Sequence, residues 1–308
     1  MIIPIYQETI FRDRVSHVIP QKLLRNKRDG ENLMFKVCKY CGEKFETNRS
    51  KREYCSHSCA NTIIARDREN IKVLEPLTTV WSCGGGVQST AIAVLICQGK
   101  LPKPDYAIMT DCGWEKSATW EYVYGVIIPK LRSIDLNLHI IKTIDYSHND
   151  LFDKSGHLVL PAYKYINGKA VRFNTHCNDA WKVKPAKRWI REQGIQRCEN
   201  WLGISVNEFK RVKESNHKWF IKRYPLIEMG LTREDCLFLI GKSGWPKPPR
   251  TSCYICPQQD DATWLSIKLK YPDDWIRAIE VEQQIHIKDP EIFLHRSLKP
   301  LDQVVFNR

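Results

Sequence analysis

The cysteines of this chain occur at spacings that suit metal ligation. Cys38 and Cys41 form a C-x2-C pair, and Cys55 and Cys59 form a C-x3-C pair a short distance further along. Four thiolates on two such knuckles match the tetrahedral shell of structural zinc, on which small cysteine-dense modules depend for stability. We therefore predict a zinc site at these four residues; four unrelated buried cysteines are the alternative.

A second set of cysteines lies far along the chain. Cys253 and Cys256 form another C-x2-C pair in TSCYICP, and Cys177 stands well upstream in NTHCNDAWK. Shells of three or four thiolates accept either zinc or a cubane iron–sulfur cluster, so these residue types leave both metals open. A reduced cysteine pair without metal is a further alternative. The fourth ligand is open among three candidates: Cys236, His176 and Cys198.

Three successive glycines, Gly84, Gly85 and Gly86, stand between an apolar run and a helical pattern that begins near Ser89 and Thr90. Glycines at such a junction let backbone N–H groups close on an anion. The hydroxyls and the positive dipole end of the helix then face the same place. The stretch therefore predicts a phosphate-binding loop.

The elements around this loop alternate in type. Residues 78–82, 105–112 and 137–145 are rich in strand-forming residues, whereas residues 89–100 and 116–131 have helical apolar spacing. Strands that alternate with helices imply crossover units and a parallel sheet, with ligands at the carboxyl ends of the strands. We predict an α/β fold with a Rossmann-like parallel sheet covered by helices on both faces.

Neither of the two commonest phosphate loops fits the glycine stretch. The kinase-type P-loop requires a lysine directly after its last glycine, and no lysine follows until Lys100; the dinucleotide fingerprint requires a third spaced glycine. The stretch resembles instead the PP-loop of ATP pyrophosphatases, S-x-S-G-G-x-D-S, with Gly84 for the second serine and Gln88 for the aspartate. That resemblance implies cleavage of ATP between its α and β phosphates. Without the aspartate, one carboxylate fewer is available for Mg²⁺.

Five further motifs in order extend the resemblance to most of the chain from about residue 78 to 275: DCGWEKSATWE, RFNTHCNDAWKVKPAKRWI, GISVNEFKRVKE, YPLIEMGLTREDCLFLI and GWPKPPRTSCYICP. They are similar to the phosphoadenosine-phosphosulfate-reductase-like superfamily, which has an adenine nucleotide alpha hydrolase-like fold. Its members include sulfonucleotide reductases, DNA phosphorothioation sulfur-transfer enzymes and phage or mobile-element proteins. The resemblance favours a [4Fe-4S] cluster at the second cysteine set. The N-terminal cysteine segment similarly resembles a treble-clef finger, which implies a closing helix after Cys59.

The resemblance and the strand order together suggest residue roles. Asp111 follows the second strand and is the candidate for holding Mg²⁺, with Glu115 as either a second ligand or an ordinary first-turn acid. Arg211 and Lys213 are candidates for neutralising charge during phosphoryl transfer, although a solvated helix face is equally consistent with them. The expected nucleotide-binding residues are Ser82, Gly84, Gly85, Gly86, Gln88, Ser89, Thr90 and Gly203. The expected metal ligands are Cys38, Cys41, Cys55 and Cys59 for zinc, and Cys177, Cys236, Cys253 and Cys256 for the cluster or zinc.

The charge balance suggests the kind of partner. Lys+Arg 48 against Asp+Glu 35 gives a formal net charge of +13, which attracts polyanions such as nucleic acid. Basic residues also alternate with Trp181, Trp189, Trp201 and Trp219, which could stack bases or simply fill the core. No stretch has the roughly 20 apolar residues of a membrane helix and no signal peptide is evident. We therefore expect a soluble, cytoplasmic protein.

These observations predict three regions: residues 1–32 without a clear structural pattern, a four-cysteine zinc finger over 33–72, and a PP-loop domain over 76–308. The leading hypothesis is an ATP-dependent enzyme that activates a nucleic acid or nucleotide by adenylation, with a sulfur-donor protein as partner if sulfur is transferred. Sulfonucleotide reduction is an alternative, which the absence of a cysteine after Cys256 argues against, because reductases of the family use a C-terminal E-C-G-[IL]-H nucleophile. A nucleotide-dependent binding module without catalysis is the other alternative.

Overall fold

The computed structural model describes residues 34–39, 41–56, 58–59, 76–148, 150–173 and 175–306. The chain divides into two compact units, residues 1–74 and residues 75–308. The segment expected at 1–32 and the helix expected after Cys59 lie outside the described residues.

The first unit contains a small antiparallel hairpin. Strand β1 (Met34–Val37) pairs with β2 (Lys44–Thr47), with Met34 opposite Thr47 and Val37 opposite Lys44. The connecting turn holds Cys38 and Cys41, and Gly42 donates its N–H to the Cys38 carbonyl at 3.0 Å. Gly42 has a φ of +76°, a conformation that favours glycine. The hairpin therefore presents the first cysteine pair on a tight knuckle.

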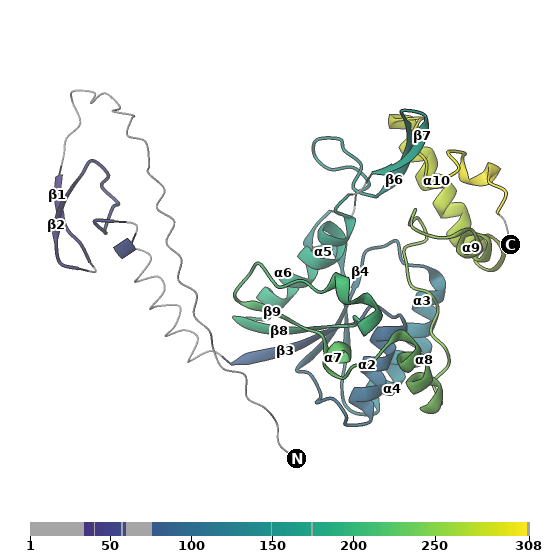
Figure 1. Cartoon of the computed structure of the whole chain (residues 1–308), viewed down its shortest axis with the longest axis horizontal. Coiled ribbons are helices and arrows are strands. Elements are labelled where there is room, and N and C mark those ends of the chain that lie inside the picture. The colour runs from purple at the N-terminus through teal and green to yellow at the C-terminus, as the bar shows by residue number, and fades with distance from the viewer. Residues whose placement is uncertain are drawn as a thin grey trace, which may run out of the picture. The chain divides into compact units, whose positions relative to one another are not determined.

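The second unit is built on one five-stranded parallel sheet (Figure 1). The strand order is β5-β4-β3-β8-β9, and all four pairings are parallel. The strands are β3 (Leu77–Ser82), β4 (Tyr106–Asp111), β5 (Leu138–Lys142), β8 (Arg197–Leu202) and β9 (Phe220–Arg223). The chain runs outward from β3 to β4 and β5 and then returns to the other side of β3. The sheet thus has its topological switch point at β3.

Adjacent residues of each strand point to opposite faces, and each face carries its own core. On one face Trp81 and Met109 pack with helices α2 (Val87–Cys97), α4 (Ile128–Arg132) and α8 (Arg233–Lys242). On the other face Val80 and Ile108 pack against Ile190 of α6 (Lys184–Glu192), with α5 (Thr143–Tyr146) nearby. Figure 1 shows these two helical layers on either side of the strands. The predicted α/β fold with helices on both faces is confirmed.

The third core joins the C-terminal segment to the end of β4. It contains Cys112, Trp181, Tyr254 and Trp264, which come from parts of the chain far apart in sequence. The remaining elements are α3 (Ser117–Tyr122), π-helix η1 (Val123–Ile127), hairpin β6 (Ala162–Ile166) and β7 (Lys169–Phe173), π-helix η2 (Asp179–Val183), 3-10 helix η3 (Val206–Arg211), α7 (Pro225–Glu228), α9 (Asp261–Lys270), α10 (Pro272–Lys288) and 3-10 helix η4 (Leu301–Gln303).

Among the described residues, no helix combines the length and the apolar character that crossing a membrane would require.

Candidate functional site

The three glycines lie at the carboxyl end of β3, which is the switch point of the sheet and the usual ligand position in such folds. Gly85 has a φ of +69°, and a Cβ there would lie 3.0 Å from Cγ2 of Thr119 and 3.1 Å from Cγ2 of Val123. A Cβ on Gly86 would lie 2.7 Å from Oγ1 of Thr251. The bare backbone is thus needed partly because α3 and the segment around Thr251 pack directly on the loop.

Polar groups next to the loop fix its conformation. The Gly84 N–H donates to Oγ of Ser89 at 2.9 Å, and Oγ of Ser82 donates to Oδ1 of Asn200 at 2.8 Å. A Cβ on Gly203 would lie 3.0 Å from the Ser89 backbone nitrogen. Gly203 therefore allows the turn after β8 to lie against the first turn of α2, a contact within the chain. Thr90 is fully buried in the same turn.

Gln88, which stands where the PP-loop pattern has an aspartate, is held by three side chains. Its Nε2 donates to Oε2 of Glu208 at 3.0 Å and to Oγ of Ser205 at 3.5 Å, and its Oε1 accepts from Nη1 of Arg233 at 3.1 Å. The structure thus places a carboxylate, Glu208, against Gln88.

Arg211 and Lys213 lie in and just after η3, on the same edge of the sheet. Nη1 of Arg211 pairs with Oε1 of Glu208 at 2.6 Å, so Arg211 reaches the loop through the Glu208–Gln88 contact. The backbone at Lys213 is held on both sides by the Tyr224 hydroxyl, which donates to the Lys213 carbonyl at 2.8 Å and accepts from its N–H at 3.2 Å. Both basic side chains are exposed.

Asp111 ends strand β4 beside the loop. Its Oδ1 accepts the Gly113 N–H at 2.8 Å, which shapes the turn after the strand. Asp111 borders a cavity of about 540 Å³. The cavity lining is Asp111, Gly113, Glu115, Ser117, Trp120, Glu121, Tyr124 and Arg277.

A buried cysteine group lies directly beyond Asp111. Sγ of Cys112 is 3.7 Å from Sγ of Cys253, and Oε1 of Glu115 lies 3.9 Å from Cys112. These three residues offer ligand atoms within 4.8 Å of one another. A backbone bridge between Glu115 and Cys253 aligns the two segments, and the Tyr254 N–H donates to the Trp114 carbonyl at 2.8 Å. The fold therefore brings together two cysteines that are 141 residues apart.

Interactions between charged side chains in this group offset the free-energy cost of burying those charges. Lys182 forms an ion pair with Glu115, whose side chain is only 3% exposed. Burial lowers the pKa of Lys182, but the Glu115 carboxylate and the nearby Cys253 and Cys112 outweigh it, so the net pKa is raised. A hydrogen bond from Cys253 lowers the pKa of Cys112, with Lys182 adding to the effect, and the pKa of Cys253 rises in turn. Of these two thiols, Cys112 therefore loses its proton more readily.

The two other thiols of the predicted set lie beside this group. Burial followed by the charge of Cys256 raises the pKa of Cys177, and Cys112 contributes to the same effect. The Cys256 N–H donates to the Cys253 carbonyl at 3.0 Å, which forms the turn of the C-x2-C pair. Four thiols at Cys112, Cys177, Cys253 and Cys256 thus interact at one place.

The remaining candidate ligands lie elsewhere in the second unit. Cys236 is fully buried on α8 and packs in the core beneath α2, and Cys198 is buried in β8 within the core beneath α6. His176 precedes η2, and its charge acts on Asp153. The structure does not bring Cys236 or Cys198 to the buried group, because each faces a different hydrophobic core.

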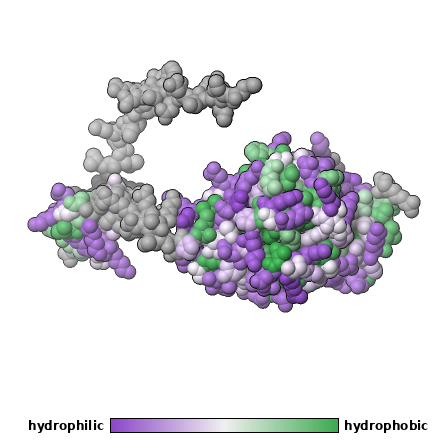
Figure 2. All heavy atoms as spheres, turned by 90° about the horizontal axis from the view of Figure 1, so that it is seen from below, coloured by the Kyte–Doolittle hydropathy of each residue, from purple (hydrophilic) through white to green (hydrophobic). Residues whose placement is uncertain are grey.

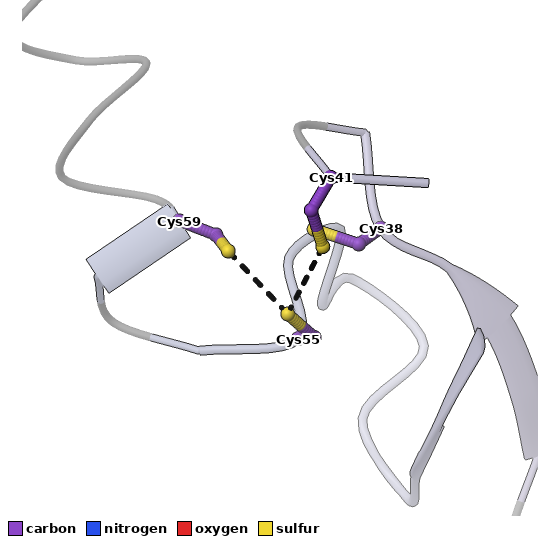
Figure 3. Close-up of side chains that lie close together, drawn as sticks. All are labelled: Cys38, Cys41, Cys55 and Cys59. Carbon is purple, nitrogen blue, oxygen red and sulfur yellow. Dashed lines mark hydrogen bonds between the residues drawn. The ribbon is translucent and has the colours of Figure 1, made fainter. Parts of the chain in front are cut away.

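The four N-terminal cysteines point toward one another (Figure 3). Their sulfurs all lie within 4.8 Å, with 3.6 Å between Cys41 and Cys55 and 3.4 Å between Cys55 and Cys59. A zinc ion at about 2.3 Å from each of four thiolates would place neighbouring sulfurs about 3.8 Å apart. Hydrogen bonds with Cys59 and then with Cys41 raise the pKa of the Cys55 thiol to about 12, so binding a cation there would have to displace protons. The group has the dimensions of a single-ion site.

The four tryptophans of the basic region divide into two kinds. Trp181 and Trp201 are almost completely buried, so their rings fill the core. Trp189 and Trp219 are half-buried at the edge of the core beneath α6, and the Arg191 guanidinium lies 3.8 Å from the Trp219 ring centroid.

No family model and no curated protein matches this chain. Among solved structures, the chain is similar to the U34-tRNA thiolase NcsA from Methanococcus maripaludis with its [4Fe-4S] cluster. The identity is 16%, the match covers 82% of each chain and the TM-score is 0.37. That likeness is too distant to transfer an activity or a ligand, so function must be argued from this chain's own geometry.

Sequence reasoning missed three members of the site. Cys112 stands alone in the sequence, and only its place directly after a strand and beside Asp111 indicated the ligand edge of the sheet. Lys182 carried no signal beyond its charge. Glu208 lies in the segment GISVNEFKRVKE, from which sequence reasoning selected Arg211 and Lys213 instead.

Proposed function

We propose that this protein is an ATP-dependent enzyme that activates a nucleic acid acceptor by adenylation, releasing pyrophosphate, for sulfur transfer at the buried cysteine group. One observation carries the proposal. The segment from Thr251 to Cys253 touches the glycine loop at Gly86 and, two residues later, places its sulfur 3.7 Å from Cys112. Three consecutive residues therefore connect the proposed phosphate loop to the thiols. Such proximity is expected if both take part in one reaction.

In this proposal the loop binds the β and γ phosphates of ATP, with backbone N–H groups at the start of α2 as donors. An acceptor oxygen attacks the α phosphorus, the bond between that phosphorus and the bridging oxygen to the β phosphate breaks, and pyrophosphate leaves. Arg211 and Lys213 would offset the charge that builds on the phosphates. Asp111 would hold Mg²⁺, which supplies further charge neutralisation when bound.

Two features near the loop fit a nucleotide. Oγ1 of Thr119, a fully buried side chain in contact with Gly85, has no hydrogen-bond partner within the part of the chain that the structure describes. Such an atom is costly unless a ligand or water satisfies it. Glu208 also compensates in charge for the aspartate missing at position 88, because it bonds directly to Gln88.

We assign the two cysteine groups to different metals. The four N-terminal sulfurs all lie within 4.8 Å of one another, close enough to bind one ion, which suits zinc at Cys38, Cys41, Cys55 and Cys59. In the buried group Cys112 and Cys253 lie 3.7 Å apart, and Cys177 and Cys256 are not part of the close group that these two form with Glu115. Four thiols are the ligand set of a [4Fe-4S] cluster, in which each cysteine binds a separate iron, so the sulfurs of Cys112 and Cys253 would have to move apart to hold one. When bound, the cluster would supply a site at which a sulfide from an external donor can be held.

The nucleic acid partner is supported by the surface of α6 and β9. Lys187 and Lys222 lie close enough for their charges to repel, and repulsion after burial lowers the pKa of Lys187. Arg188 donates to the Tyr146 carbonyl, and Arg191 donates to the Ile195 carbonyl at 3.1 Å. Within the described residues, none of these four cations has a carboxylate within ion-pair distance, so their charge is available to a phosphate backbone. The visible face of this unit in Figure 2 is largely hydrophilic, with apolar patches between.

Product analysis tests the proposal directly. Full-length protein with ATP, Mg²⁺ and single-stranded DNA or RNA is expected to release pyrophosphate in an amount equal to the sum of adenylated strand and free AMP. Asp111→Asn is expected to slow that reaction by about a hundredfold, because the carboxylate that holds the metal becomes a neutral amide. ADP as the product would refute adenylation.

The Gln88 contacts also favour a second candidate function, nucleotide-dependent binding without cleavage. Gln88 is fixed by Glu208 and Arg233, so the loop could close on ATP without a catalytic carboxylate of its own. Tight ATP binding with no AMP formed on any strand would support this candidate over the enzyme.

A further inference from the structure

The cavity beside Asp111 has a flat aromatic wall and a polar rim. The rings of Trp120 and Tyr124 are stacked, with centroids 5.6 Å apart and planes 30° from parallel. Tyr124 remains 57% exposed, so its ring offers surface to another flat group. At about 540 Å³ the cavity is within the range of small-molecule sites.

Helix α3 and the start of η1 separate this cavity from the glycine loop. Thr119 and Val123 face the loop at Gly85. The other side of this helical segment lines the cavity with Ser117, Trp120, Glu121 and Tyr124. Asp274 of α10 anchors the start of α3, accepting the Ser117 N–H and hydroxyl at 2.8 Å each. A phosphate-bearing ligand and a second ligand could therefore occupy opposite sides of one helix.

The same cavity reaches the buried cysteines. Glu115 lines the cavity and also lies 3.9 Å from the Cys112 sulfur. Glu115 thus belongs both to the cavity wall and to the cysteine group.

Charge selects the chemistry of the occupant. The cavity is lined by three carboxylates, Asp111, Glu115 and Glu121, of which Glu115 pairs with Lys182. The cation in the lining, Arg277, already pairs with Asp274 at 2.5 Å. A phosphate is disfavoured there, and a neutral flat ring that donates hydrogen bonds is favoured. Among the described residues, Glu121 accepts a hydrogen bond from the Tyr271 hydroxyl at 3.4 Å, and a carboxylate can accept several more.

We infer that this cavity binds a nucleobase of the acceptor strand, stacked on Tyr124 and read at an amino group by Glu121. The inference rests on the proposed function, since it names how the acceptor would enter that site. Stacking on an aromatic ring tolerates any base, whereas a carboxylate accepts from the amino group of cytosine but not from the carbonyl of thymine or uracil.

The experiment measures binding of short single strands to the full-length protein by fluorescence anisotropy, without turnover. The probes are an all-cytosine strand, an all-thymine strand and an abasic strand of equal length. We expect Tyr124→Ala to weaken the cytosine strand about tenfold and to leave the abasic strand within about twofold, with Tyr124→Phe close to wild type. Glu121→Gln is expected to reduce the preference for cytosine over thymine.

Titration with ATP in place of the strands tests whether the base in the cavity is the adenine of ATP or a base of the acceptor strand. If Tyr124→Ala weakens ATP and leaves every strand unchanged, the cavity holds the adenine of ATP and the inference is overturned. Equal losses for the cytosine and abasic strands would also overturn it, while the proposed nucleic acid partner would stand. Failure of the wild-type protein to bind any strand would overturn the partner itself and this inference with it.

Discussion

The two cysteine groups of this protein share a ligand type but differ in everything around it. Cys38 and Cys41 lie in the turn of a short hairpin and Cys55 and Cys59 follow it; Cys41 is exposed, and among the described residues no His, Asp or Glu joins the four sulfurs. The buried pair sits at the carboxyl end of a parallel sheet, with Glu115 beside the sulfurs and Lys182 held against that carboxylate. The surroundings of the first group therefore favour a purely structural role for a metal bound there. The second group has charged neighbours, a cavity and the glycine loop nearby, and such an arrangement is typical of functional sites.

The largest expected effect is on the N-terminal group, because a hairpin of two short strands has little core of its own. Cys55→Ser should remove the zinc and unfold residues 34–59, since structural zinc supplies about 10 kcal/mol or more of folding free energy in such modules. Zinc content and trypsin cleavage within this segment would measure it. Cys97→Ser, which changes a cysteine outside both groups, is the control and should alter neither. Retained zinc in Cys55→Ser would refute the four-thiolate site.

The ion pair at the buried group should have the next largest effect. Lys182→Met leaves the Glu115 carboxylate buried without its partner, which we expect to cost about 3 kcal/mol of unfolding free energy or less, because Lys182 is 37% exposed. Chemical denaturation of the full chain would measure it. Lys184→Met is the matched control, because that lysine pairs with Asp179 where both side chains are more than half exposed, and it should cost under about 1 kcal/mol. Equal losses in the two variants would mean that Lys182 is an ordinary surface cation.

The contact that joins the loop to the buried group can be tested by a double substitution. Gly86 has a φ of −90°, so Gly86→Ala brings no backbone strain and acts only by pushing its Cβ against Thr251. We expect a loss of about 1–3 kcal/mol of stability, from overpacking. Gly86→Ala with Thr251→Ala should recover most of that loss, since the obstructing atoms are then gone. Gly125→Ala, at a glycine with open space around it, is the control. Additive losses in the double variant would contradict the contact.

The smallest effect concerns the helix that follows the C-x2-C pair. Asp260 accepts from the N–H and hydroxyl of Thr263 at the start of α9, and these bonds, with Arg250, lower its pKa to about 2. Because that folded value lies below the ordinary aspartate value of about 3.9, the ionised carboxylate stabilises the fold above pH 4 or so, and this contribution declines as the pH falls toward 2. Asp260→Asn should therefore show a shallower loss of stability between pH 5 and 3 in urea titrations. If unfolding free energy falls with pH equally in the wild type and in Asp260→Asn, the pKa of Asp260 does not change on folding.

The sequence predicted features that depend on contacts between residues close in the chain, and it did not predict those that depend on contacts between distant residues. The strand–helix alternation from Thr78 onward was enough for the fold class, because local periodicity and the crossover rule determine it. The glycine loop was placed correctly at a strand end for the same reason. Zinc-like spacing at Cys38 and Cys41 was also local, and the four sulfurs do converge.

The composition of the buried group could not be read from spacing. Cys112 meets Cys253 only because β4 and the C-terminal segment pack together, a contact with no local pattern. Cys236 was an attractive candidate by residue type, yet it lies four residues before Ile240 on the buried face of α8, and that apolar spacing was the available sign of a core position. Gly203 likewise contacts the chain's own helix, where the sequence suggested substrate.

Metal analysis of protein purified without oxygen tests the contrast between the two groups most directly. Iron, zinc and acid-labile sulfide per chain would be measured in the wild type, Cys55→Ser and Cys253→Ser. The account predicts that Cys55→Ser loses zinc and keeps iron and sulfide, whereas Cys253→Ser loses iron and sulfide and keeps zinc. Two zinc ions and no iron in the wild type would contradict it, because both cysteine groups would then be structural.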